Sequence, residues 1–175
     1  MTQTLSSTPL RKAAFLDRDG VINIDSGYVG RWEDFHFVPG IFELLHRLMA
    51  DGYLLVIVTN QSGIARGMFT ENDYLRLTEK YLEVLTTHGI KIDAVYHCPH
   101  HPQGAVAKYS IRCECRKPAP GMILKAISDL GIDPTKSLLI GDSERDLEAG
   151  RSAGVSKLIL FDEKRPTEWQ TTAGQ

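Results

Sequence analysis

The chain has 175 residues, of which 42% are hydrophobic, so it suits one domain with a single core and leaves little room for a second. Its formal net charge of -2 and the lack of a long basic run exclude the surface that nucleic-acid binding needs. No apolar stretch approaches the ~20 residues of a membrane span, and residues 1–12 lack the apolar core of a signal peptide. We therefore expect a cytoplasmic monomer without nucleic-acid or membrane partners. We expect a disordered or irregular tail over 1–12 and a single domain over 13–175.

The first apolar run, 13–16, predicts a buried strand, and Asp17, Asp19 and Gly20 follow it directly. A carboxylate at the carboxyl end of a buried strand can attack phosphorus, and a second one two positions later can transfer protons. Asp-x-Asp-Gly is also an ordinary strand-ending turn, because Asp and Gly suit turn backbones. The pair alone leaves both interpretations open.

Further apolar runs of strand length alternate with helical patterns along the chain. The runs cover 54–58, 92–96, 137–140 and 157–161, and apolar residues recur at helical spacing over 41–48, 74–85 and 123–130. Strands that read as continuous apolar runs are buried on both faces, so this order predicts an α/β fold with a doubly wound, mainly parallel, Rossmann-like sheet. The ligand crevice of such a sheet lies outside the carboxyl ends of its strands. No stretch is long enough for a large cap domain.

The segment 59–63, Thr-Asn-Gln-Ser-Gly, follows the second predicted strand. Its hydroxyl, amide and backbone N–H groups can hold phosphate oxygens, although the same residues are common in loops. Lys117 precedes the helix expected to begin near Pro120. Its ammonium group could neutralise both a nucleophile and a transferred phosphoryl group.

Asp142 follows the fourth predicted strand and is expected to face Asp17 across the crevice. A carboxylate in this place suits a hard divalent cation such as Mg²⁺. The alternative is that Asp142 or Ser143 caps the next helix, and both interpretations can hold for different residues.

The three cysteines of the chain, Cys98, Cys113 and Cys115, lie in one short window with several histidines. An odd number of cysteines without an export signal argues against disulfides and favours a metal. Cys98-x-His and Cys113-x-Cys115 offer the four ligands of a tetrahedral zinc site, which would be structural because no position stays open for water. Spacing does not decide the nitrogen ligand among His97, His100 and His101. We expect a zinc-binding loop at 98–117, here called the 98–117 loop.

Taken in order, these motifs closely resemble those of the haloacid dehalogenase superfamily of phosphatases. The four matching segments are 15–21, Thr59-Asn60, Lys117, and Gly141-Asp142 with Asp146. Over roughly 13–160 the resemblance narrows to the heptose-1,7-bisphosphate phosphatases, and the histidinol-phosphate phosphatases are near relatives that share much of it. The segments that carry the narrower resemblance are 25–29, 59–67, 98–102 and 113–118.

The resemblance implies a fold of haloacid dehalogenase type and a magnesium-dependent phosphoric monoester hydrolase. It would remove the 7-phosphate of D-glycero-D-manno-heptose 1,7-bisphosphate through an aspartyl-phosphate, in ADP- or GDP-heptose precursor synthesis for lipopolysaccharide core or S-layer. The alternative is a histidinol-phosphate phosphatase of histidine biosynthesis. The implied catalytic residues are Asp17 as nucleophile, Asp19 as general acid and base, and Thr59 and Lys117 as stabilisers of the phosphoryl group.

The resemblance also implies ligands and substrate contacts. Mg²⁺ would bind Asp17, the backbone carbonyl of Asp19, and Asp142, and structural Zn²⁺ would bind Cys98, His100, Cys113 and Cys115. The small-molecule sugar phosphate would contact Asp25, Ser26, Gly27, Tyr28, Asn60, Gln61, Ser62, Arg116 and Ser143. Arg116 is the expected reader of a second anionic group, because its planar guanidinium carries a fork of donors.

Two other classes of protein compete with this interpretation. A receiver-type signalling domain also combines a phospho-acceptor Asp with Thr and Lys, but its acidic pair precedes the phospho-acceptor strand. Asp19 lies where it would destroy the aspartyl-phosphate on which such a domain depends. A zinc-organised binding module without catalysis would leave Asp17, Asp19 and Asp142 unexplained.

Overall fold

A computed structural model describes residues 9–165 of the chain. A five-stranded sheet in the order β3-β2-β1-β4-β5 forms its centre, and every neighbouring pair is parallel. The strands are β1 (Ala13–Leu16), β2 (Leu54–Asn60), β3 (Ala94–Cys98), β4 (Leu138–Gly141) and β5 (Lys157–Leu160). The predicted parallel, doubly wound α/β fold is confirmed.

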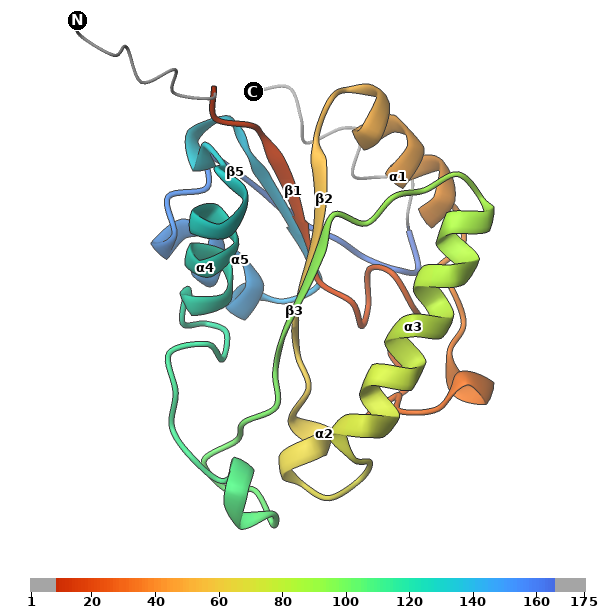
Figure 1. Ribbon diagram of the computed structural model, residues 1–175, viewed down its shortest axis with the longest axis vertical. Coiled ribbons are helices and arrows are strands. Elements are labelled where there is room, and N and C mark those ends of the chain that lie inside the picture. The colour runs from red at the N-terminus through yellow and green to blue at the C-terminus, as the bar shows by residue number, and fades with distance from the viewer. Residues whose placement is uncertain (1–8, 166–175) are drawn as a thin grey trace, which may run out of the picture.

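Helices cover both faces of the sheet, with α1 and α3 on one side and α4 and α5 on the other (Figure 1). The α-helices are α1 (Ile41–Ala50), α2 (Ser62–Ala65), α3 (Glu71–Thr87), α4 (Gly121–Leu130) and α5 (Glu144–Ser152). Three short 3-10 helices are η1 (Trp32–Asp34), η2 (Ala107–Tyr109) and η3 (Pro134–Lys136). No helix in residues 9–165 combines the length and apolar character needed to cross a membrane.

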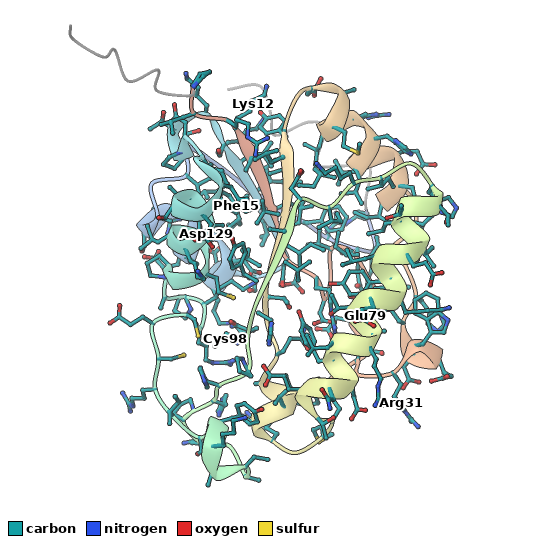
Figure 2. All side chains as sticks on the ribbon, in the orientation of Figure 1. Lys12, Phe15, Arg31, Glu79, Cys98 and Asp129 are labelled. Atoms are coloured by element: carbon teal, nitrogen blue, oxygen red, sulfur yellow. The ribbon has the colours of Figure 1, made fainter. Side chains whose placement is uncertain are left out.

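The core consists of two layers because β1 alternates its side chains between the two faces. Ala14 and Leu16 pack in the layer that includes α1 and α3. Ala13 and Phe15 pack in the layer that includes α4 and α5, and Figure 2 shows Phe15 on the side of α4. Burial on both faces explains why the first strand reads as an unbroken apolar run.

Four strands differ from the sequence prediction at their ends: β4 and β5 by one residue, and β2 and β3 by two. β2 continues to Asn60, and β3 covers Ala94–Cys98 where 92–96 was predicted. Both extend through polar residues because their backbones continue to pair, with Thr59 beside His97 and Asn60 beside Cys98. The backbones of the polar residues at the ends of both strands are therefore held by the sheet itself.

The predicted tail over 1–12 is joined to the fold at its described end. The amide of Arg11 donates to the carbonyl of Gly131 at 2.9 Å, and the carbonyl of Lys12 accepts from the amide of Leu54 at 2.9 Å. The other predictions for the chain ends concern residues 1–8 and 166–175, which lie outside the described residues. The carboxyl ends of β1, β2 and β4 meet at one edge of the sheet, beside α2 and the 98–117 loop (Figure 1).

Candidate active site

Three carboxylates gather at the carboxyl edge of the sheet. Asp17 follows β1, Asp142 follows β4, and Asp146 lies in the first turn of α5; one oxygen of each lies within 4.8 Å of the others. Gly20 makes this approach possible, because a Cβ at that position would lie 2.2 Å from Asp142 Oδ2. Gly141 does the same for Asp146, whose Cβ would lie 2.2 Å from an added methyl group. The two glycines therefore make room for the acidic cluster.

Lys117 is buried among these carboxylates. Its Nζ lies 3.0 Å from Asp17 Oδ1 and 2.6 Å from Asp146 Oδ1, and it donates to the carbonyl of Val58 at 2.8 Å. The side chain of Asn60 holds the Lys117 backbone, because Nδ2 donates to its carbonyl at 3.1 Å and Oδ1 accepts from its amide at 3.0 Å. The end of β2 thus fixes the place of the lysine.

The cluster carries more negative than positive charge. Burial raises the pKa of Asp17 to about 7, against the attraction of Lys117 and with the repulsion of Asp146. Burial and the repulsion of Asp146 also raise the pKa of Asp142 to about 6. With all three carboxylates ionised, three negative charges face the one positive charge of Lys117, which leaves a net charge of -2. Hard oxygen donors with this excess charge fit a divalent cation such as Mg²⁺.

Asp19 is oriented by three side-chain donors. Arg18 Nη2 and Asn23 Nδ2 donate to Oδ1 at 2.8 and 3.0 Å, and Gln61 Nε2 donates to Oδ2 at 2.9 Å. Arg18 is fully buried and also donates to the carbonyl of Val29 at 2.7 Å. Sequence reasoning missed Arg18 and Asn23 as supporting residues. The position of an arginine between the two aspartates was the available signal.

The 98–117 loop brings four predicted metal ligands together. Cys98 Sγ lies 3.5 Å from Cys113 Sγ and 3.7 Å from His100 Nδ1. Cys115 Sγ lies 3.3 Å from Cys113 Sγ, 3.5 Å from His100 Nδ1 and 2.8 Å from Cys98 Sγ. Ligands of tetrahedral zinc stand about 3.6–3.8 Å apart, from Zn–S near 2.3 Å and Zn–N near 2.0 Å. Four of the five distances between ligand atoms are near these values, and the Cys98–Cys115 distance is shorter. The set of three sulfurs and one ring nitrogen fits zinc.

The rival histidines have other partners. His97 Nε2 lies 2.9 Å from Glu71 Oε1, at the start of α3. His101 Nε2 lies 3.1 Å from Arg66 Nη2. Of the three candidate histidines, His100 is the one whose ring nitrogen lies beside the cysteine sulfurs. Figure 2 shows Cys98 at the end of β3, next to the 98–117 loop.

A crevice of 380 Å³ lies over the acidic cluster, within the size range of small-molecule sites. Its lining includes Asp17, Asp19, Lys117 and Asp142, together with the predicted substrate contacts Asp25, Gly27, Tyr28, Asn60, Gln61, Ser62, Arg116 and Ser143. Ser26 and Thr59 are not among its lining residues. Thr59 is fully buried, and its Oγ1 accepts from Gln61 Nε2 at 2.8 Å.

Four polar lining residues were not predicted as site residues: Arg66, His101, Arg145 and Asp146. All four lie within or between the residues of recognised motifs, but their place in the crevice depends on tertiary structure that a motif does not state. Burial lowers the pKa of Arg116, and repulsion by Arg145 and, more weakly, by Arg66 lowers it further. Positive charge is therefore concentrated around Arg116.

Comparison with known proteins places this geometry among phosphatases. The family described as "HAD-hyrolase-like" matches residues 114–172. The D-glycero-beta-D-manno-heptose-1,7-bisphosphate 7-phosphatase of Pasteurella multocida (strain Pm70) is 48% identical over 157 residues, covering 90% of this chain and 85% of that protein. The D-glycero-alpha-D-manno-heptose-1,7-bisphosphate 7-phosphatase of Burkholderia mallei (strain ATCC 23344) is 47% identical over 162 residues, covering 93% and 86%.

A solved structure shows the same fold at lower sequence identity. The crystal structure of D,D-heptose 1.7-bisphosphate phosphatase from B. bronchiseptica, complexed with magnesium and phosphate, matches with a TM-score of 0.77. It is 34% identical, and the match covers 91% of this chain and 86% of that one.

Proposed function

Because the chain belongs to the heptose-1,7-bisphosphate 7-phosphatase family of HAD-like phosphatases, we propose that it removes the 7-phosphate of D-glycero-D-manno-heptose 1,7-bisphosphate. The product, heptose 1-phosphate, would then enter the synthesis of nucleotide-activated heptose. One observation carries the proposal: Asp17, in contact with Lys117 and beside Asp142 and Asp146, lines a crevice of small-molecule size. The names of the relatives favour this substrate over histidinol phosphate.

Asp17 is the proposed nucleophile. Its Oδ1 accepts from the amide of Arg18 at 2.8 Å and lies 3.0 Å from Lys117 Nζ. Within residues 9–165, Oδ2 has no hydrogen-bond partner, so this oxygen is available to form a bond to phosphorus. In the first step Oδ2 bonds to phosphorus, the bond from phosphorus to the sugar oxygen breaks, and an aspartyl-phosphate forms.

Asp19 is the proposed proton carrier in both steps. It gives a proton to the leaving sugar oxygen, and the resulting carboxylate then takes one from the water that attacks phosphorus. That attack breaks the bond between phosphorus and Asp17 and releases inorganic phosphate. Oδ1 is held by Arg18 and Asn23, whereas the one hydrogen-bond partner of Oδ2 within residues 9–165 is the neutral amide of Gln61. We therefore assign the proton transfers to Oδ2.

Lys117 and Thr59 are the proposed stabilisers of the phosphoryl group. Loss of one such donor costs on the order of 3 kcal/mol in the transition state of other enzymes. Lys117 has the necessary position beside Asp17. The hydroxyl of Thr59 could reach a phosphate oxygen only after Gln61 releases it, so Thr59 would act through a rearrangement of that contact.

Asp17, the backbone carbonyl of Asp19, and Asp142 are the proposed ligands of Mg²⁺. The Asp19 carbonyl accepts no backbone hydrogen bond within residues 9–165, and the Asp142 carboxylate has no cationic partner there. Bound Mg²⁺ would cancel the repulsion between the Asp17 carboxylate and the phosphate dianion. Asp146 serves the site differently, because its Oδ1 holds Lys117 and its Oδ2 caps α5 through Ser143.

Cys98, His100, Cys113 and Cys115 are the proposed ligands of a structural Zn²⁺. Their closeness in a loop with few buried apolar residues supports this assignment. Zinc binding in comparable small sites is worth about 10–16 kcal/mol, which is ample to order such a loop. Arg116 and Lys117 follow Cys115 directly, so the same ion would fix the direction of both cations.

The proposed substrate contacts surround the crevice. Asp25, Gly27 and Tyr28 line it from the loop after β1, and the segments after β2 and β4 supply Asn60, Gln61, Ser62 and Ser143. Asn60 uses both ends of its amide on the Lys117 backbone. We therefore propose that Asn60 acts mainly by positioning Lys117.

The direct test measures phosphate release with Mg²⁺ from both anomers of heptose 1,7-bisphosphate and from histidinol phosphate. We expect kcat/KM to be highest for a heptose bisphosphate, with the 1-phosphate retained on the product. The Asp17→Asn variant should lose nearly all activity, and a rapid-quench trap should place labelled phosphate on Asp17 of the parent enzyme. Preferred turnover of histidinol phosphate would disprove the substrate assignment, and label on another side chain would disprove the mechanism.

A further inference from the structure

A fully buried arginine lies beside Asp19. Arg18 stands between the two aspartates of the first motif, and no part of its side chain is exposed. One of its nitrogens, Nη2, makes two hydrogen bonds, to Asp19 Oδ1 at 2.8 Å and to the carbonyl of Val29 at 2.7 Å. The other two, Nε and Nη1, are buried and have no hydrogen-bond partner within residues 9–165. The rest of this guanidinium group must therefore be held by other contacts.

Three hydroxyl groups of α3 belong to the same buried region. Tyr74, Thr78 and Tyr81 recur at helical spacing, so they share one face of α3, and each is at most 8% exposed. Their hydroxyl oxygens are buried and make no well-aligned hydrogen bond within the described part of the chain. Burial raises the pKa of both tyrosines and Thr78 acts on both in the opposite direction, so the three groups are neighbours. They are here called the hydroxyl face of α3.

The hydroxyl face of α3 packs against Arg18. The guanidinium carbon lies 5.9 Å from the centre of the Tyr74 ring and 5.9 Å from that of Phe35, and Phe35 stacks on Tyr81 with 5.1 Å between ring centres. Burial acts to lower the pKa of Arg18, but Asp19 and, more weakly, Tyr81 and Tyr74 raise it above its usual value. The aromatic rings and hydroxyl oxygens of α3 thus favour the charged form of the buried guanidinium group.

Stability does not account for this arrangement. Apolar side chains in place of a buried ion pair are often neutral or stabilising, and loss of a buried hydroxyl that has no partner removes a cost. Groups that oppose local stability are expected at functional sites. The side-chain hydrogen bonds of Arg18 end on Asp19 and on Val29, which directly follows the proposed substrate contact Tyr28. Arg18 therefore joins α3 to the proposed proton carrier.

The direction of the Asp19 carboxylate depends on this contact. Arg18 and Asn23 hold Oδ1, so their positions determine where Oδ2 points. A small displacement of Arg18 would turn Oδ2 away from the leaving oxygen, and proton transfer depends on that geometry. Resting on the proposed role of Asp19, we infer that the hydroxyl face of α3 consists of positioning residues, which hold Arg18 and through it direct Asp19 for proton transfer.

The test compares two phosphate esters that differ in their need for a proton on the leaving oxygen. Heptose 1,7-bisphosphate releases a sugar oxygen that must be protonated, whereas p-nitrophenyl phosphate releases a phenolate that is stable without a proton. For Tyr74→Phe, Thr78→Val and Tyr81→Phe we expect kcat/KM on the heptose ester to fall about 5- to 10-fold. On p-nitrophenyl phosphate it should fall less than about twofold. Side chains that only support the fold would lower both values alike.

Two further variants sharpen the comparison. Tyr53→Phe is the matched control, because it removes a partly buried tyrosine hydroxyl before the amino end of β2, away from the crevice, and should behave like the parent. Arg18→Met should lower the heptose value further, and Tyr74→Phe added to Arg18→Met should cause no additional loss, because the hydroxyl acts through Arg18. Melting temperatures show whether each variant folds, and the single hydroxyl variants decide the question if Arg18→Met does not fold.

Equal losses on the two esters, no loss on either, or an additional loss in the double variant would overturn the inference. Asp19→Asn tests the proposed function separately. It should lower kcat/KM on the heptose ester at least about 100-fold and change the value for p-nitrophenyl phosphate far less. If Asp19→Asn lowers the ratio of the two values and the hydroxyl variants do not, the inference alone fails. If Asp19→Asn leaves that ratio unchanged, the proposed role of Asp19 fails, and the inference fails with it.

Discussion

We expect the magnesium-free protein to lose stability as the pH rises from about 4 to about 8, and magnesium to reverse most of that loss. The pKa of Asp17 is about 7 in the folded protein, against 3.8 for an ordinary aspartate. Between these two values the folded state binds this proton more tightly than the unfolded chain does. The resulting stabilisation is complete below about pH 4 and is lost as the pH rises through about 7.

The magnitude follows from the difference between the two pKa values. It corresponds to about 4 kcal/mol in the free energy of unfolding, or about 10 °C in melting temperature for a chain of this size. Asp142, whose pKa is about 6, adds to the effect in the same direction, but it is exposed and so adds less. Magnesium competes with these protons, so it should stabilise the protein far more at high pH than at low pH.

The assay is urea unfolding at a series of pH values, in buffer without magnesium and then with it. Magnesium should be omitted rather than chelated, because a chelator would also remove a metal from the 98–117 loop. Asp17→Asn is the matched control, since it keeps the shape of the side chain and removes its titration. If parent and variant show the same pH dependence without magnesium, or if magnesium stabilises the parent equally at both ends of the range, the electrostatic reasoning is wrong.

Three further predictions concern the same crevice. Gly20→Ala should lower kcat/KM at least about 100-fold, since its Cβ would displace Asp142, whereas Gly40→Ala has a similar positive φ with open space around it and should cost only stability. Lys117→Met should lower the free energy of unfolding in urea by about 3–5 kcal/mol and lower kcat at least about 100-fold. An unchanged free energy of unfolding would contradict the assigned role of the buried ion pairs. Removal of metal from the 98–117 loop should raise KM before the circular dichroism of the sheet changes, and added zinc should restore KM; full activity without the metal would refute its positioning role.

Sequence reasoning located the sheet because its strands are buried on both faces. The run 13–16 contains no polar residue, so its apolar pattern is unbroken. β1 begins and ends at the same residues in the structure. The ends of β2 and β3 were less predictable, since Thr59, Asn60 and His97 are polar and continue the strands only through pairing with each other's backbones. The order of the motifs along the chain was sufficient to predict that the carboxyl ends of β1, β2 and β4 lie together.

The supporting contacts of the site could not be predicted in the same way. Nothing in the spacing of Asn60 and Lys117 states that the amide of one holds the backbone of the other, because they are brought together by tertiary structure. The choice of His100 over its neighbours likewise depends on where the side chains of His97 and His101 find their partners. Arg145 was visible in the fourth motif, but its relation to Arg116 appears only when α5 and the 98–117 loop are placed together.

Three consecutive residues connect the parts of this site. Cys115 belongs to the cysteine and histidine cluster, Arg116 lines the crevice, and Lys117 contacts the acidic cluster. Consecutive Cα atoms lie about 3.8 Å apart, so a displacement of the cluster by even part of that distance reaches both cations. Lys117 tolerates little displacement, because its Nζ must remain in contact with Asp17 and Asp146 at once. A metal ion bound by Cys115 would therefore fix the positions of Arg116 and Lys117 relative to each other.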